Sequence, residues 1–303
     1  MTSPSAELPR HELLGFAANP GSLDDYLAFL AARIGAREPC TVLYHNLHSL
    51  YAYFTDAALR RDYAGTTVLV DGMPVIWLMR ALGLPVTRED RLTYVDFILP
   101  MMRLARDEGW TVQHVGQDAA TLERALEIVR REVPGIRIDG HHGYFDQGAG
   151  SAGSLAVVDA MNAAGADLVL VGFGAPRQEA WIAAHRERID APAVLACGAC
   201  MEYVAGAVRT PPRILGKLGL EWAFRLLENP RRFAFRYGVE PFLLGALLVR
   251  NAVRDGLRSG PADIPASATG STDEGIGDGT GHGTGHGNGH GTGHGTGERA
   301  AER

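Results

Sequence analysis

Apolar strand patterns and amphipathic helical patterns alternate along the first two thirds of the chain. We expect strands over residues 41–45, 66–70, 111–115, 136–140, 166–171 and 193–197. Helical patterns cover residues 22–33, 47–61, 74–82, 94–108, 119–132, 155–164 and 176–189. This alternation predicts an α/β fold, with a Rossmann-like, largely parallel sheet flanked by helices. Ligands of such folds bind beyond the carboxyl ends of the strands.

One strand end carries a distinctive turn, in the segment Val171-Gly-Phe-Gly-Ala-Pro-Arg-Gln-Glu-Ala-Trp181. Gly172 and Gly174 allow the backbone to pass close to a ligand, and Pro176 suits the first turn of a helix. Because free N–H groups at a helix start bind phosphate, the segment predicts an anion pocket with Arg177 and Gln178 at its mouth. An ordinary strand-to-helix turn is the alternative interpretation.

Polar side chains follow three other predicted strands. Asp71 comes directly after an apolar strand, where its carboxylate is placed to act as a general base toward a hydroxyl. Asn46 closes the preceding strand and is placed to bind a sugar or a base. A structural role as a helix cap competes for both residues. The segment Gly140-His-His-Gly-Tyr-Phe145 ends a third strand, and we expect all three strand ends to meet the glycine turn.

The composition divides the chain into three parts. Residues 1–208 form the predicted α/β core, and residues 209–255 form a helical C-terminal appendage without strand patterns. Residues 209–258 contain nine Arg and one Lys but only four acidic residues, so the net charge of this segment is +6 and that of the rest of the chain is −12. A basic segment of this kind points to an anionic partner, and the competing interpretation is a solvated helix face.

The remaining features are the C-terminal tail, the three cysteines and the lack of a long apolar run, of which the last two argue against a disulfide-bonded secreted protein and a transmembrane protein. Residues 256–303 end in a Gly-His-Gly-Thr tract that predicts a disordered tail, for which transient metal binding is one option. Cys40, Cys197 and Cys200, without a secretory leader pattern, favour a reducing cytoplasm. The pair Cys197 and Cys200 is interpreted as two small core residues rather than a metal site. The chain has no apolar run of about 18 residues that would span a bilayer.

The motifs together resemble the WecG/TagA/CpsF family of glycosyltransferases over roughly residues 14–239. Asn46 with the helix after it and Val70-Asp-Gly-Met-Pro-Val75 are similar to two family segments. Other similar segments are Arg91-Leu-Thr-Tyr-Val-Asp96, Gly140 to Phe145, Gly172 to Trp181 and Arg209 to Tyr237.

The resemblance implies an inverting transfer of a sugar from a UDP-sugar to a polyprenyl-diphosphate-linked saccharide. N-acetylmannosamine is the default sugar, with UDP-glucose and UDP-glucuronate as alternative donors. Asp71 would be the general base. The implied substrate-binding residues are Asn46, Asp96, Gly172, Gly174, Pro176, Gln178, Glu179, Glu202, Arg213, Arg225 and Arg232. The sequence has no Asp-x-Asp motif, so we expect no metal or other cofactor and a leaving diphosphate held by arginines, backbone N–H groups and helix dipoles.

The resemblance also implies a cytoplasmic protein held peripherally at the anionic inner face of the plasma membrane. Nucleic acid is not among the expected partners, and a homo-oligomer remains an option. Three positions depart from the family pattern: Tyr44 stands in place of a threonine, Tyr94 of a glycine and Glu202 of an aspartate. These departures leave the reaction class intact and the sugar identity open.

Two other classes of function share part of the pattern. A nucleotide-dependent oxidoreductase would have the same alternating sheet, but no early strand is followed by Gly-x-Gly-x-x-Gly. A non-catalytic module that binds a membrane surface or nucleic acid would use the basic appendage alone. Such a module would leave Asp71 and the glycine turn unexplained.

Overall fold

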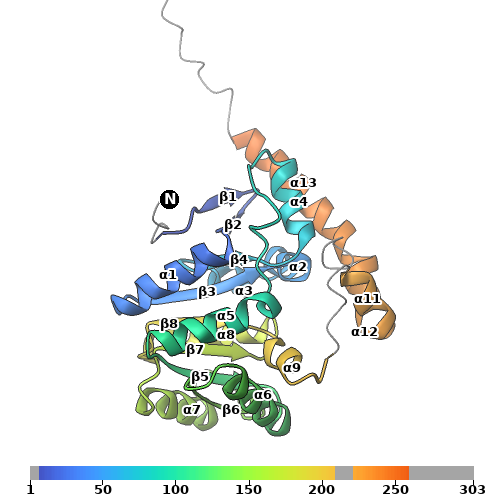
Figure 1. Cartoon of the computed structure of the whole chain (residues 1–303). Coiled ribbons are helices and arrows are strands. Elements are labelled where there is room, and N and C mark those ends of the chain that lie inside the picture. Colours follow the sequence, from blue (N-terminus) through green and yellow to red (C-terminus); the bar gives the residue numbers. More distant parts are fainter. Residues whose placement is uncertain (1–6, 209–220, 259–303) are drawn as a thin grey trace, which may run out of the picture. The chain divides into compact units, whose positions relative to one another are not determined.

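The computed structural model describes residues 7–208 and 221–258, and its centre is a six-stranded sheet in which every pairing is parallel. The strand order is β4-β3-β8-β7-β5-β6. The strands are β3 (Cys40–His45), β4 (Thr67–Val70), β5 (Thr111–Gly116), β6 (Arg137–His141), β7 (Leu168–Gly172) and β8 (Ala193–Ala196). Helices flank this sheet (Figure 1), as the alternating pattern predicts.

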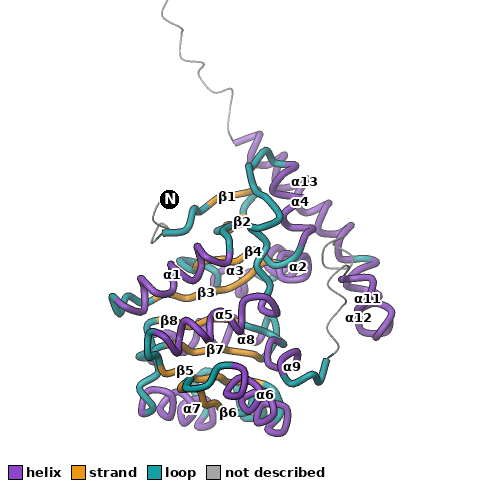
Figure 2. The backbone as a smooth tube through the Cα atoms, viewed as in Figure 1, coloured by secondary structure: helices purple, strands orange, loops and turns teal. Residues whose placement is uncertain are grey.

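The central strands β7 and β8 are buried along their whole length, which explains their continuous apolar sequences. The flanking helices are α1 (Leu23–Gly35), α2 (Leu47–Thr55), α3 (Ala57–Asp62), α4 (Met73–Ala81), α5 (Tyr94–Asp107), α6 (Ala119–Glu132), α7 (Ala152–Ala163), α8 (Arg177–His185) and α9 (Cys200–Val204). Figure 2 shows the strands enclosed by these helices. The expected fold class is confirmed.

Local capping explains where the helices begin. Ser22 and Asp25 form a reciprocal capping box at the start of α1. The single helix expected over residues 47–61 is wrong, because Asp56 interrupts it. Its backbone is extended, and its carboxylate accepts hydrogen bonds from the N–H groups of Ala58 and Leu59, so a second helix starts there.

A short antiparallel hairpin precedes the sheet and was not expected from the sequence. It consists of β1 (His11–Leu13) and β2 (Phe16–Ala18). Asn19, just after the hairpin, donates its N–H to the carbonyl of Val68 and accepts the N–H of Val68 at its side-chain oxygen, at 2.8 and 3.0 Å. The hairpin is thereby tied to the edge strand β4.

The described part of the appendage is helical, with α11 (Glu221–Glu228), α12 (Pro230–Gly238) and α13 (Glu240–Arg258). α13 packs on α2, and its Leu244 and Leu248 are buried in the core. None of the described helices combines the length and apolar character needed to cross a membrane. The three-part division of the chain stays a prediction, since residues 209–220 and 259–303 lie outside the described residues.

Candidate functional site

Asn46 and Asp71 lie side by side at the carboxyl end of the sheet. His45 and Val70 are partners in the β3–β4 ladder, and the Asp71 N–H continues it by donating to the His45 carbonyl at 2.9 Å. Asp71 does not cap α4, because the capping position belongs to Gly72, with φ +104 and no side chain. The Asp71 carboxylate is half-buried, and its charge is among the causes that raise the pKa of the Tyr44 hydroxyl, after burial and Glu179.

Asn46 serves as the N-cap of α2. Its Oδ1 accepts the Ser49 N–H at 3.0 Å, and its own N–H donates to Ser49 Oγ at 2.7 Å. Arg236 of α12 also donates to Asn46 Oδ1, at 3.4 Å. The cap interpretation is thus confirmed, and binding of a substrate by the rest of the Asn46 amide stays a prediction.

Gln178 lies inside the protein, which corrects the prediction that placed it at the mouth of a pocket. Its side chain is 0% exposed and makes four hydrogen bonds. Oε1 accepts the N–H groups of Gly174 and Gly198 at 3.2 and 3.0 Å. Nε2 donates to Tyr44 Oη at 3.1 Å and to Glu179 Oε1 at 3.0 Å. Gln178 therefore connects the β7 turn with the ends of β3 and β8.

The start of α8 is also occupied by internal hydrogen bonds. The N–H groups of Arg177 and Gln178 both donate to the Gly174 carbonyl, at 3.0 and 3.3 Å, and Pro176 has no N–H. An anion pocket needs free N–H groups at this point. In this conformation the N–H groups of Gly174, Arg177 and Gln178 are all engaged within the protein, and binding of a ligand by this turn stays a prediction.

Gly172 is required by close contacts within the protein. A Cβ at this position would lie 2.9 Å from both Gln117 Nε2 and the Gly198 carbonyl oxygen. Gln117 donates to the carbonyl oxygens of Gly172 and Gly198, at 3.1 and 3.2 Å. Gly174 instead has φ +79 with open space around it. Gly172 thus allows the ends of β5, β7 and β8 to pack closely, whereas Gly174 serves the turn through its positive φ.

The prediction that all three polar strand ends gather at the glycine turn is wrong, because the segment after β6 lies far from Asn46 and Asp71. β6 is an edge strand, four strand spacings from β3, which corresponds to about 19 Å at about 4.8 Å per spacing. The segment does meet the glycine turn, because Phe145 and Phe173 pack edge to face at 5.8 Å. Asn46 and Asp71 follow β3 and β4, which lie at the opposite edge of the sheet from β6.

Glu179 is a buried carboxylic acid beneath these strand ends. It is 1% exposed, and its Oε2 has no hydrogen-bond partner. Burial raises its pKa from an ordinary 4.5 to about 7, although the hydrogen bond from Gln178 acts in the opposite direction. Because the Glu179 side chain is enclosed by the protein, its contact with a substrate would require a different conformation.

Glu179 should make stability depend on pH. Between pH 4.5 and 7 the folded state holds more protons at Glu179 than the unfolded state, so stability falls as pH rises through this window. At 1.36 kcal/mol per pKa unit, the free energy of unfolding of Glu179→Gln should rise relative to wild type by about 3 kcal/mol between pH 4.5 and pH 8, and should not change relative to wild type below pH 4.5. Urea unfolding of both proteins across this pH range tests the prediction. A difference in unfolding free energy that does not vary with pH would contradict the raised pKa of Glu179.

Arg91 is a further candidate site residue, outside the set expected from the sequence. The Leu92 N–H donates to the Val70 carbonyl at 2.9 Å, so Arg91 and Asp71 belong to adjacent backbone segments. The Arg91 side chain is 9% exposed, and its Nη2 lies 3.7 Å from an oxygen of Asp96. Asp96 itself is exposed on the first turn of α5. The sequence signal for Arg91 is its place at the start of the motif Arg91 to Asp96, whereas its enclosure is seen only in the structure.

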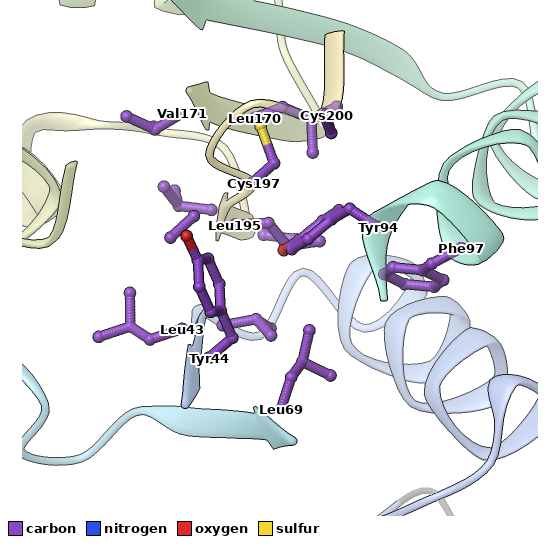
Figure 3. Packing of buried hydrophobic residues seen from close by; sticks show 14 of the residues in the cluster. Leu43, Tyr44, Leu69, Tyr94, Phe97, Leu170, Val171, Leu195, Cys197 and Cys200 are labelled. Atoms are coloured by element: carbon purple, nitrogen blue, oxygen red, sulfur yellow. The ribbon is translucent and has the colours of Figure 1, made fainter. Parts of the chain in front are cut away.

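Two of the three departures from the family pattern pack together. The rings of Tyr44 and Tyr94 meet at 6.1 Å, and both point into the core beside Cys197 (Figure 3). The Tyr94 hydroxyl is buried without a hydrogen-bond partner. Glu202, the third departure, is partly exposed on α9, which begins at Cys200. The two tyrosines therefore shape the protein interior beneath the strand ends.

The cysteines fit the core interpretation. All three are free and buried, and burial raises the pKa of the Cys40 thiol to about 11. Within residues 7–208 and 221–258, which the structure describes, no group of three or more metal-ligating side chains occurs. Arg213 lies outside the described residues, as do the side chains of Arg225 and Arg232, whose backbones belong to α11 and α12.

Comparison with known proteins adds independent findings. The model of the glycosyl transferase WecG/TagA/CpsF family matches residues 11–257. A similar protein is the N-acetylglucosaminyldiphosphoundecaprenol N-acetyl-beta-D-mannosaminyltransferase of Staphylococcus aureus strain MW2, 26% identical over 182 residues, which is 60% of this chain and 69% of the relative. The protein of the same description from strain MRSA252 has the same identity and coverage.

Proposed function

Because this chain belongs to the WecG/TagA/CpsF family of glycosyl transferases, we propose that it transfers a sugar from a UDP-sugar to a polyprenyl-diphosphate-linked saccharide. The default donor is UDP-N-acetylmannosamine, since the relatives are described as N-acetylmannosaminyltransferases acting on N-acetylglucosaminyldiphosphoundecaprenol. UDP-glucose and UDP-glucuronate are the alternative donors. The product belongs to cell-surface polysaccharide or teichoic-acid-type synthesis.

The observation that carries the mechanism is the position of Asp71. Its carboxylate follows β4 at the carboxyl end of the sheet, beside Asn46, and it is not a helix cap. In the proposed reaction, Asp71 accepts the proton of the acceptor hydroxyl while the hydroxyl oxygen bonds to the anomeric carbon of the donor. UDP leaves from the opposite face, so the configuration inverts. The leaving diphosphate is held by cationic side chains without a metal ion.

UDP release with a panel of UDP-sugars tests this function. The assay uses a short-chain polyprenyl-diphosphate-N-acetylglucosamine acceptor, in buffer with EDTA. We expect one donor to give UDP release that depends on the acceptor and continues with EDTA. Release without acceptor would indicate a hydrolase. Loss of turnover with EDTA, restored by Mg²⁺, would contradict the metal-independent mechanism. Tight retention of NAD would support the oxidoreductase alternative.

The acceptor would reach the site from the cytoplasmic face of the plasma membrane, and α13 presents a surface suited to that location. Phe242, Val249 and Val253 are 77%, 65% and 56% exposed, and their spacing places them on one stripe. Arg250 and Arg254 are exposed on the same helix. An apolar stripe with adjacent cations binds at an anionic lipid surface. We therefore propose peripheral attachment through this stripe.

The variant Phe242→Glu/Val249→Glu should lose membrane binding. Burial of two such side chains is worth about 3–5 kcal/mol, so the fraction bound to vesicles with anionic lipid should fall at least about tenfold. A charge-matched control, Ala120→Glu/Ala160→Glu, changes exposed positions on α6 and α7. Flotation compares the three proteins. Equal flotation of wild type and the α13 variant would rule out this stripe as the attachment surface.

A further inference from the structure

Two contacts join the appendage to the first turn of α2. His48 Nδ1 lies 2.9 and 3.1 Å from the two carboxylate oxygens of Glu240, at the start of α13. Arg236 Nη2, on α12, lies 3.4 Å from Asn46 Oδ1. α2 begins where β3 ends, so both contacts lie at the carboxyl end of the sheet. The appendage thus meets the strand end beside Asp71.

Glu240 has the properties of a positioning residue. It is 4% exposed, and a buried carboxylate is costly unless a polar or cationic partner compensates it. Only Val239 separates α12 from α13 at this point, and its N–H donates to the Phe235 carbonyl at 2.9 Å. Because the link is this short, the Glu240–His48 contact also fixes the position of Arg236.

The Arg236 guanidinium has unused capacity. It is half-buried, and among the described residues it makes one long hydrogen bond and no ion pair. The nearby carboxylate of Glu240 is directed to His48. A guanidinium carries five N–H donors in a planar fork that matches phosphate oxygens. A guanidinium that contacts Asn46 and has further N–H donors is therefore suited to bind an anionic group of a substrate.

We propose that Arg236 binds a substrate diphosphate in the transfer reaction, and that the Glu240–His48 pair positions it. The inference rests on the proposed function, and adds to it a residue outside the set expected from the sequence. The diphosphate belongs to either the donor or the lipid-linked acceptor, and the two have the same chemistry. Charge-assisted bonds from Arg236 to it would strengthen binding or stabilise the leaving group.

The test measures UDP affinity by calorimetry, together with KM for donor and acceptor and kcat, in full-length protein. Arg236→Ala should weaken UDP binding or raise one KM by about tenfold or more, as expected for loss of a hydrogen bond to a charged group. If the donor KM and the UDP affinity both change, Arg236 binds the diphosphate of the donor. If only the acceptor KM changes, Arg236 binds the diphosphate of the lipid-linked acceptor. Arg236→Lys should restore part of the loss. Arg103→Ala, an exposed arginine on α5, is the control.

Variants of the positioning pair separate this role from general stabilisation. Glu240→Ala should reproduce the loss of Arg236→Ala, and Glu240→Gln should lose less, because its amide can still hydrogen-bond His48. In the double variant Arg236→Ala/Glu240→Ala the loss should equal that of Arg236→Ala alone, since both changes remove one interaction. Additive losses would overturn the positioning role.

Two further outcomes are distinguishable. Active wild-type protein with unchanged UDP affinity, KM and kcat in Arg236→Ala would overturn the assignment of Arg236 alone. Wild-type protein that neither binds UDP nor transfers any sugar would overturn the proposed function, and the assignment with it.

Discussion

Substitution of Asp71 by Asn should reduce kcat by about 10²–10⁴-fold, the usual contribution of a positioned general base. Asparagine keeps the size of the side chain and cannot accept the proton of the acceptor hydroxyl. The UDP affinity should change little, because the change removes a step of the reaction and leaves the diphosphate contacts in place. The backbone hydrogen bond from Asp71 to His45 is also retained, so the fold should be unaffected.

Steady-state transfer and calorimetric UDP titration of the same preparation check this expectation. Asp190→Asn is a matched control, because Asp190 is exposed just before β8, at the opposite end of the sheet. Turnover within tenfold of wild type in Asp71→Asn would exclude Asp71 as the base. Loss of both turnover and UDP affinity would assign Asp71 to donor binding instead.

The sheet could be predicted from the sequence because its strands are encoded locally. β7 and β8 are buried on both faces and therefore read as continuous apolar runs. Strand starts and ends lie within two residues of the expected positions. The β1–β2 hairpin escaped prediction because its two strands have only three residues each and depend on contacts with β4. The break at Asp56 required recognition of a cap within an apolar helical pattern.

The site was less predictable because its contacts join residues far apart in the sequence. The adjacency of Asn46 and Asp71 follows from consecutive strands that pair, which local patterns favour. The burial of Gln178 depends on Tyr44 and Gly198, which are 134 and 20 residues away. The contact of Arg236 with Asn46 spans 190 residues. A local sequence motif cannot predict contacts between residues so far apart along the chain.

The buried polar groups beneath the strand ends connect these observations. Tyr44 immediately precedes His45 on β3, and its hydroxyl accepts a hydrogen bond from Gln178. His45 is 0% exposed among aromatic rings, and burial lowers its pKa to about 3, so it stays neutral. The strand end that carries Asn46 thus rests on uncharged, enclosed side chains. Its geometry is set by packing in the core, and substitutions there should alter the substrate site indirectly.

Gln178→Met should be strongly destabilising, with a loss of about 4–6 kcal/mol in the free energy of unfolding. Methionine has a similar length and no hydrogen-bonding amide. The change leaves the N–H groups of Gly174 and Gly198, the Tyr44 hydroxyl and Glu179 Oε1 without the partner they have now. Each buried group left unsatisfied costs about 1–3 kcal/mol, and partial relaxation lowers the sum. A loss of this size is comparable with the whole stability of many domains, about 5–15 kcal/mol.

Urea unfolding measures the loss, with Gln147→Met as the control. Gln147 is only half-buried and makes a single hydrogen bond, to the Gly143 carbonyl, so its replacement should cost about 1 kcal/mol. If Gln178→Met kept wild-type stability and showed a raised KM for the donor, Gln178 would face the substrate after all. The buried position found here would then belong to a conformation that opens when the donor binds.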